Sequence, residues 1–161
     1  MADTRVKPII ATSRMLVAVE AVPEATAVIA AAVQMATRSG AEVVVLSVRE
    51  REVARGLAWD VRPPAELAEV LSRAIYQLQR AGVQARGIIR MAPTGRVAEA
   101  IVDAAHRHQA DQIIVGSRRR TWLGAWLSGS VAPRVVRLSD LPVVAVPLKR
   151  AAQRSGAAPN R

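Results

Sequence analysis

The side chains used most often in catalysis and metal binding are scarce in this chain. It has no cysteine, and its two histidines are His106 and His108. Without cysteine it cannot form a disulfide scaffold, a thiolate zinc site, an iron–sulfur cluster or a cysteine nucleophile. The two histidines are two positions apart, so on a helix their side chains would point in different directions. We expect both to be solvated residues near a helix end. We therefore expect no redox centre, no metal site and no catalytic residue, so the chain is not predicted to be an enzyme.

A glycine and a serine at the start of a predicted helix point to a different chemistry, the binding of an anion. Gly129 and Ser130 follow a long loop that contains Arg118, Arg119 and Arg120. The first amides of a helix are unpaired and carry a partial positive charge, which suits phosphate. The arginines add charge-assisted donors. Two simpler explanations stay open, because the pair can serve only as a helix cap and the arginine run can be a solvated loop.

Two familiar phosphate-binding motifs are absent. The segment that follows the first predicted strand, residues 20–25, has no glycine and so lacks the dinucleotide fingerprint. Gly124 and Gly129 have the spacing of a P-loop, but Ser130 occupies the place where that motif needs lysine. The sequence supports neither NAD binding nor P-loop hydrolysis.

The elements that would position these residues follow from the apolar pattern. Five short apolar runs predict strands, and they alternate with segments of helical apolar spacing. The predicted strands are residues 15–19, 43–48, 84–91, 112–115 and 143–146. Helix boundaries are predicted at Gly40, Pro63-Pro64, Gly82 and at Thr94, which is the expected N-cap of the third helix. Residues 49–62 are predicted to form a polar loop.

These elements predict an α/β fold. Strands that are almost continuously apolar are typical of a parallel sheet covered by helices on both faces. We expect an open, doubly wound, five-stranded parallel sheet of order 3-2-1-4-5, with one layer of helices on each face. The chain has 161 residues, 51% of them hydrophobic, which suits one domain over residues 13–148. Residues 1–12 and 149–161 show no periodic pattern and are predicted to be flexible tails.

Hydropathy and charge bear on location and partners. No apolar run approaches the ~18–20 residues of a membrane helix, and the first residues lack a secretory signal, so a cytoplasmic protein is expected. The formal net charge is +10, and all but two of the 23 basic residues are arginine. That charge would suit nucleic acid or another polyanion. With three tryptophans, one tyrosine and no phenylalanine, the chain offers few stacking platforms, which makes this the weakest hypothesis.

In the predicted strand order the ligand site lies between the first and fourth strands, outside their carboxyl ends. The residues there are Val19, Glu20 and those that follow Val115. Six segments of the chain are informative when they are taken together: Met15–Glu20, Val43–Val48, Gly95–Ile101, Ala110–Ser117, Gly129–Val131 and Leu141–Pro147. In their order and spacing they resemble the universal stress proteins, over the chain from Arg14 to Pro147.

The resemblance extends to the nucleotide-binding loop of that family, with changes. The loop after the fourth strand there has Gly, two residues, Gly, nine residues, then Gly and Ser or Thr. Gly116, Gly129 and Ser130 fit this pattern, whereas Arg119 replaces the second glycine. Glu20 replaces the usual aspartate after the first strand, and Ala21 replaces the glycine that follows it.

The resemblance implies a stress-response sensor or regulator that binds ATP, AMP or another adenine nucleotide. In it, Val19 and Glu20 contact adenine and ribose, and Val48 lines the base pocket. The residues implied to hold the phosphates are Gly116, Ser117, Arg118, Arg119, Gly129, Ser130 and Val131. A Mg²⁺ ion would bridge phosphate oxygens rather than sit in a protein cage. At most, slow ATP hydrolysis is implied.

Partners are predicted from the last strand. The last predicted strand is an apolar edge made of Val143, Val144, Ala145 and Val146. Such an edge commonly pairs with a second copy of itself. The resemblance also implies a homodimer. A second hypothesis stays open beside nucleotide binding. On that view Arg119 blocks the nucleotide site, and the protein acts through unidentified protein partners.

Overall fold

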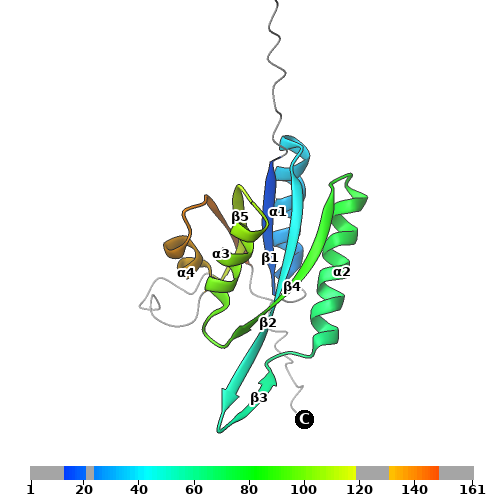
Figure 1. Cartoon of the computed structure of the whole chain (residues 1–161). Helices are drawn as coiled ribbons and strands as arrows, with labels where there is room; N and C mark the ends of the chain where they lie inside the picture. The colour runs from blue at the N-terminus through cyan, green and yellow to red at the C-terminus, as the bar shows by residue number, and fades with distance from the viewer. Residues whose placement is uncertain (1–12, 21–23, 119–130, 149–161) are drawn as a thin grey trace, which may run out of the picture.

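The computed structural model describes residues 13–20, 24–118 and 131–148. It contains a central sheet with helices packed on both faces (Figure 1). The strands are β1 (Arg14–Val19), β2 (Glu42–Ala54), β3 (Leu57–Asp60), β4 (Ala85–Pro93), β5 (Gln112–Arg118) and β6 (Val143–Leu148). The helices are α1 (Glu24–Ser39), α2 (Pro64–Arg80), α3 (Val97–Arg107) and α4 (Val131–Leu138). The predicted tails, residues 1–12 and 149–161, lie outside the described residues.

The five predicted strands form one parallel sheet in the predicted order. β1 pairs in parallel with β2 on one side and with β5 on the other, and β5 pairs in parallel with β6. β4 pairs in parallel with β2 along the side away from β1. In chain order of the predicted strands this is 3-2-1-4-5, so the α/β prediction is confirmed. The sheet has a sixth strand, β3, that the sequence analysis did not predict.

The predicted polar loop over residues 49–62 is wrong, because this segment is a β-hairpin. β2 continues to Ala54, turns at Arg55-Gly56 and returns antiparallel as β3. Arg55 and Gly56 have φ of 50° and 78°, the positive values that a two-residue type I′ turn requires. Arg49 donates to both carboxylate oxygens of Asp60 at 2.7 Å, which ties the two strands together. The strands of a solvent-exposed hairpin can carry charged side chains, so the polarity of residues 49–62 did not distinguish a hairpin from a loop.

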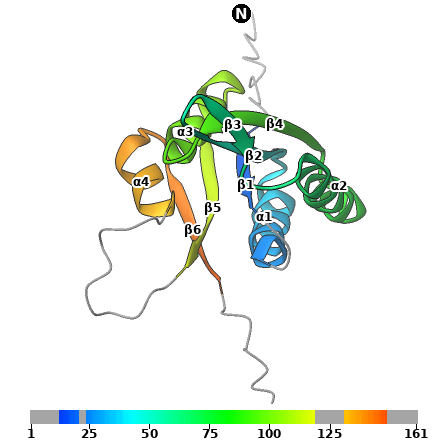
Figure 2. The ribbon, with the colours of Figure 1, turned by 90° about the horizontal axis from the view of Figure 1, so that it is seen from below.

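Two apolar clusters fill the space between the sheet and the helices. One lies under α1 and α2 and includes Val17, Val45 and Ile114 from the sheet. The other lies on the opposite face, under α3 and α4, and includes Leu16, Leu46 and Ile113. Adjacent residues of each strand thus serve opposite faces, which is why the strands are almost continuously apolar. Figure 2 shows the helix pairs on the two sides of the sheet.

The predicted helix boundaries hold with one exception. Gly40 follows α1 with φ of 69°, and Gly82 follows α2 with φ of 78°, so both glycines end their helices as expected. Thr94 is not the N-cap of α3, because that position is Arg96, which makes no side-chain cap bond. The Thr94 hydroxyl instead donates to the carbonyl of Arg51 at 3.3 Å. The competing acceptor lies 43 positions away and is invisible to a local pattern.

Among the described residues, no helix is both long enough and apolar enough to cross a membrane.

Candidate functional site

The candidate site lies where the chain leaves β1 and β5 in opposite directions. These strands are parallel neighbours, with Ala18 opposite Val115 in the register. Glu20 follows the end of β1, and Gly116 and Ser117 lie in the last part of β5. The chain then runs to α1 on one face and toward α4 on the other. This is the topological switch point, the usual ligand position of an open α/β sheet.

The structure describes only part of the predicted site. The backbone of Arg118 ends β5, while Ala21, Arg119, Gly129 and Ser130 lie outside the described residues. Val131 is the first residue of α4, and its half-buried side chain packs against the apolar cluster under α3 and α4.

Glu20 is held by an arginine that the sequence analysis did not identify. Arg62, just before α2, donates from Nη2 to Glu20 Oε1 at 3.2 Å and from Nη1 to the Glu20 carbonyl at 3.0 Å. The same guanidinium lies 3.8 Å from a carboxylate oxygen of Glu66. Arg62 is 42 positions from Glu20, so no local pattern signals the pair. A cation and an anion are thereby set side by side at the switch point.

Val19 and Val48 were predicted to contact the same base, but their side chains lie on opposite faces of the sheet. Val19 belongs to the cluster under α1 and α2, whereas Val48 packs against the cluster under α3 and α4. The residue opposite Val19 in β2 is Ser47, which is 0% exposed. Its hydroxyl has no hydrogen-bond partner within the described residues.

Gly116 has a packing role that does not depend on any ligand. A Cβ at this position would lie 2.8 Å from Cδ1 of Leu148, the last residue of β6. Adjacent strands can therefore bring this leucine over the β5 backbone only because position 116 lacks a side chain. The glycine was predicted from the phosphate-loop pattern, and the structure adds this second reason for it.

The hairpin beyond the site is fixed by charge. The bidentate hydrogen bonds from Arg49 lower the pKa of Asp60 below its ordinary value, and the same bonds raise the pKa of Arg49. A second cation, Arg51, has its Nε 3.8 Å from Asp60. β3 ends two residues before Arg62. The ion pairs of Arg49 and Arg51 with Asp60 therefore help to orient the segment in which Arg62 contacts Glu20.

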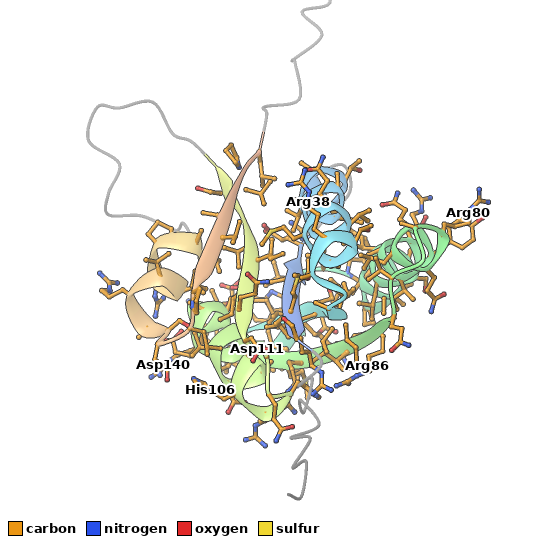
Figure 3. All side chains as sticks on the ribbon, turned by 90° about the horizontal axis from the view of Figure 1, so that it is seen from above. Arg38, Arg80, Arg86, His106, Asp111 and Asp140 are labelled. Atoms are coloured by element: carbon orange, nitrogen blue, oxygen red, sulfur yellow. The ribbon has the colours of Figure 1, made fainter. Side chains whose placement is uncertain are left out.

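The histidines lie at the other end of the sheet. His106 Nε2 is 3.1 Å from Asp140, close to where Asp111 accepts a 2.7 Å bond from the Arg14 N–H at the start of β1. Figure 3 shows His106, Asp111 and Asp140 together at this end. Neither histidine can reach the switch point, and no described group of acids and histidines is arranged to hold a metal ion.

Comparison with known proteins gives this fold a family. The sequence pattern described as "Universal stress protein family" matches residues 12–147. No protein of curated function matches the sequence. Among solved structures, a universal stress protein from Archaeoglobus fulgidus is 25% identical with a TM-score of 0.67, and the match covers 83% of this chain and 98% of that one.

Two further structures of the same fold carry a nucleotide. A universal stress protein from Archaeoglobus fulgidus in complex with dAMP is 22% identical, with a TM-score of 0.61 and coverage of 83% and 97% of the two chains. A universal stress protein family protein from Arabidopsis thaliana with AMP bound is 17% identical, with a TM-score of 0.58 and coverage of 92% and 99%. The family pattern spans the whole described sheet except the last residue of β6, and on that basis this chain belongs to the universal stress protein family.

Proposed function

We propose that this protein binds an adenine nucleotide at the carboxyl ends of β1 and β5 and acts as a stress-response sensor or regulator. The observation that carries the proposal is the position of Glu20 beside the end of β5 at the switch point of a universal stress protein fold. Related structures of this fold in complex with dAMP and AMP support it.

The roles of the residues follow from their positions. Glu20, whose side chain is 62% exposed and whose Oε1 accepts from Arg62, would contact the ribose. Val19, whose side chain is 4% exposed, would form the buried base of the proposed site next to Glu20. Gly116 and Ser117, in the last part of β5, would face the phosphates. Arg62 lowers the cost of bringing phosphate near Glu20, because its guanidinium offsets the charge of that carboxylate.

The proposed ligand is ATP or AMP, with Mg²⁺ held by phosphate oxygens when a polyphosphate is bound. The described residues at the switch point do not bring together the three or more acidic or histidine side chains that a protein cage around Mg²⁺ would need. We propose a binding protein rather than an enzyme, since neither histidine lies at this end of the sheet and the chain has no cysteine.

Titration calorimetry tests this proposal on protein stripped of carried-over ligand by unfolding and refolding. ATP and AMP are expected to bind saturably, and Glu20→Gln is expected to weaken binding about tenfold, the effect of ~1.4 kcal/mol. Glu52→Gln on the exposed hairpin is the matched control and should bind as wild type does. Absence of saturable heat with millimolar ATP or AMP would defeat the proposal and favour a family member that acts through protein partners alone.

We also propose a homodimer through β6. The Ile113 N–H donates to the Pro142 carbonyl at 2.9 Å, so the backbones of alternate residues from 142 onward face β5. The N–H and C=O groups of Val143 and Ala145 therefore face outward along the sheet edge. Ala145 is exposed, and a small side chain allows close approach of a second β6. Figure 2 shows β6 at this edge of the sheet.

A further inference from the structure

The opposite edge of the sheet is formed by β4, and its outer side has no partner strand within the described structure. The Val43 N–H donates to the Gln84 carbonyl at 2.8 Å, and the Thr94 N–H donates to the Arg51 carbonyl at 2.9 Å. Both bonds use even-numbered residues of this segment, and successive residues of a strand point their backbone groups to alternate sides. The outward N–H and C=O groups in the middle of the strand are therefore those of Gly87, Ile89 and Met91.

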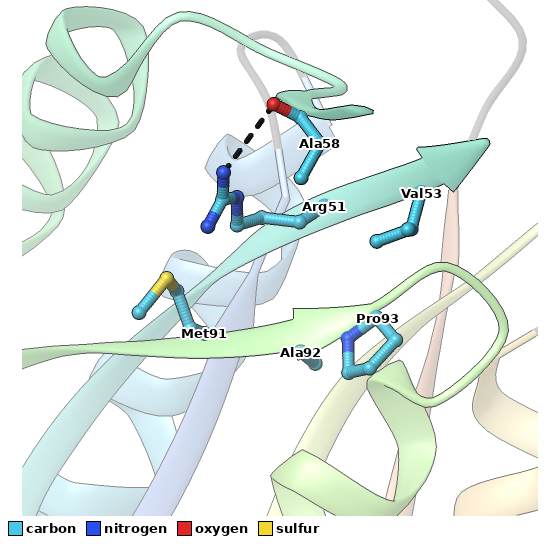
Figure 4. A pocket seen from close by; sticks show the side chains of 6 residues that line it. All are labelled: Arg51, Val53, Ala58, Met91, Ala92 and Pro93. Carbon is cyan, nitrogen blue, oxygen red and sulfur yellow. Dashed lines mark hydrogen bonds between the residues drawn. The ribbon is translucent and has the colours of Figure 1, made fainter. Parts of the chain in front are cut away.

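Apolar side chains accompany these unpaired groups. Ile89 is 45% exposed and Met91 is 62% exposed, although both are large apolar residues within a strand. Next to Met91, where β4 meets the hairpin, there is a hollow of about 230 Å³ (Figure 4). It is lined by Arg51, Val53, Ala58, Met91, Ala92 and Pro93. A neighbouring strand could place an apolar side chain in this hollow.

The charges along this edge are positive. Arg86 and Arg90 are the charged residues of β4, and both project to the α3 side. Arg90 lies 3.6 Å from Asp103, which Arg107 already engages at 2.8 Å. Arg86 meets the His108 ring rather than an acid. Figure 3 shows Arg86 at the rim of the sheet. The edge therefore favours an acidic partner.

We propose that the outer edge of β4 receives an extended segment of a partner protein as an added strand, in which apolar residues alternate with acidic ones. The apolar residues would cover Ile89 and Met91 and enter the hollow, and the acidic residues would face Arg86 and Arg90. Main-chain hydrogen bonds give affinity in such strand addition, and alternate side chains give specificity. A second copy of β4 fits poorly, because antiparallel pairing would bring the arginines of both copies onto one face. The proposal does not depend on nucleotide binding.

A labelled nine-residue peptide of alternating valine and glutamate, matching the nine residues of β4, is the probe for a test with the full chain. Fluorescence anisotropy should show saturable binding, and a peptide with lysine in place of glutamate should bind at least about tenfold more weakly. N-methylation of the valines and of the glutamates is then tested separately. Because alternate N–H groups of an added strand face β4, one set should abolish binding and the other should leave it intact.

Variants locate the site. Met91→Glu places a carboxylate at the hollow on an already exposed position and should weaken binding about tenfold. Val136→Glu is the control. Val136 is 55% exposed on α4, which packs near the opposite edge of the sheet, at β5 and β6. Amide exchange of Ile89 should slow with peptide bound, while that of Arg90, already directed at β2, should not change.

Four results would overturn the proposal: no saturable binding of the glutamate peptide, equal binding of the lysine peptide, equal tolerance of both N-methylated sets, or equal affinities of Met91→Glu and wild type. A shift of Met91→Glu from dimer to monomer in sedimentation would instead assign this edge to a second copy of the chain, which also contradicts it.

Discussion

His108, which follows α3, sits among arginines from three elements. Arg86 Nη2 lies 3.2 Å from His108 Nδ1, and Arg14 donates to the His108 carbonyl at 2.8 Å. Burial lowers the pKa of His108 below its ordinary value of 6.5, and the charges of Arg86, Arg90, Arg14 and Arg107 lower it further. A guanidinium cannot accept a hydrogen bond, so Nδ1 accepts here and the neutral ring carries its proton on Nε2.

This predicts a loss of stability in mild acid. The unfolded chain takes up a proton on His108 as the pH falls through about 6.5, while the folded chain resists it, so the free energy of unfolding falls with pH in that window. His108→Asn should show a smaller fall between about pH 7.5 and 5.5, measured by urea unfolding. Parallel curves for wild type and His108→Asn would contradict the assignment.

Ser47 offers a second prediction at this scale. Its side chain is fully buried, and its hydroxyl has no hydrogen-bond partner within the described residues. A buried unsatisfied hydroxyl costs free energy, so Ser47→Ala should raise the free energy of unfolding by about 1 kcal/mol. Ser139→Ala is the contrasting variant, because that hydroxyl accepts from the Leu141 N–H at 3.0 Å, and it should lower stability by about 1 kcal/mol. Chemical denaturation of both variants measures the difference, and a destabilised Ser47→Ala would refute it.

At the scale of elements, the packing of α2 on β4 depends on one missing side chain. A Cβ at Gly87 would lie 2.6 Å from Cδ1 of Ile75 and 2.8 Å from Cγ of Leu71, both on α2. A sequence pattern treats a glycine inside a strand as a weak point of the strand. The structure shows instead that it lets the helix approach the backbone of an edge strand.

Gly87→Ala should therefore destabilise the protein by about 1–3 kcal/mol through overpacking. Leu71→Ala in the same chain removes the obstructing Cγ, so the double variant should be more stable than the sum of the two single effects predicts. Thermal unfolding of the four proteins completes this cycle. Strict additivity would show that the Leu71 side chain does not obstruct a side chain at position 87.

At the scale of the whole molecule, the edge of β6 decides the proposed assembly. Ala145→Pro removes an outward N–H without touching the bonds to β5, and should yield monomers. Ala145→Ser, which keeps that N–H, is the matched control and should stay dimeric. Val144→Asp should also disrupt the dimer, but Val144 packs against the core cluster under α1, so its folding must be checked first. Sedimentation velocity measures the outcome, and an unchanged coefficient for folded Ala145→Pro would exclude this interface.

Local sequence predicted most of the architecture because apolar periodicity is a property of neighbouring residues. The runs at 15–19 and 113–115 are buried on both faces, and burial on both faces leaves no polar position to interrupt the pattern. The hairpin escaped prediction because its strands are exposed and charged. Its turn, Arg55-Gly56, has only one of the residues typical of a type I′ turn.

For the site, the sequence by itself determined the family, the strand order and therefore the position of the switch point where we propose that a ligand binds, since the carboxyl ends of β1 and β5 must meet once the order is fixed. Tertiary structure alone decided that Arg62 holds Glu20, that Val19 and Val48 face opposite sides, and that the outer edge of β4 has no partner strand among the described residues. Each of these depends on groups far apart in the chain that a one-dimensional pattern does not bring together, because contacts between such groups exist only after the sheet has formed.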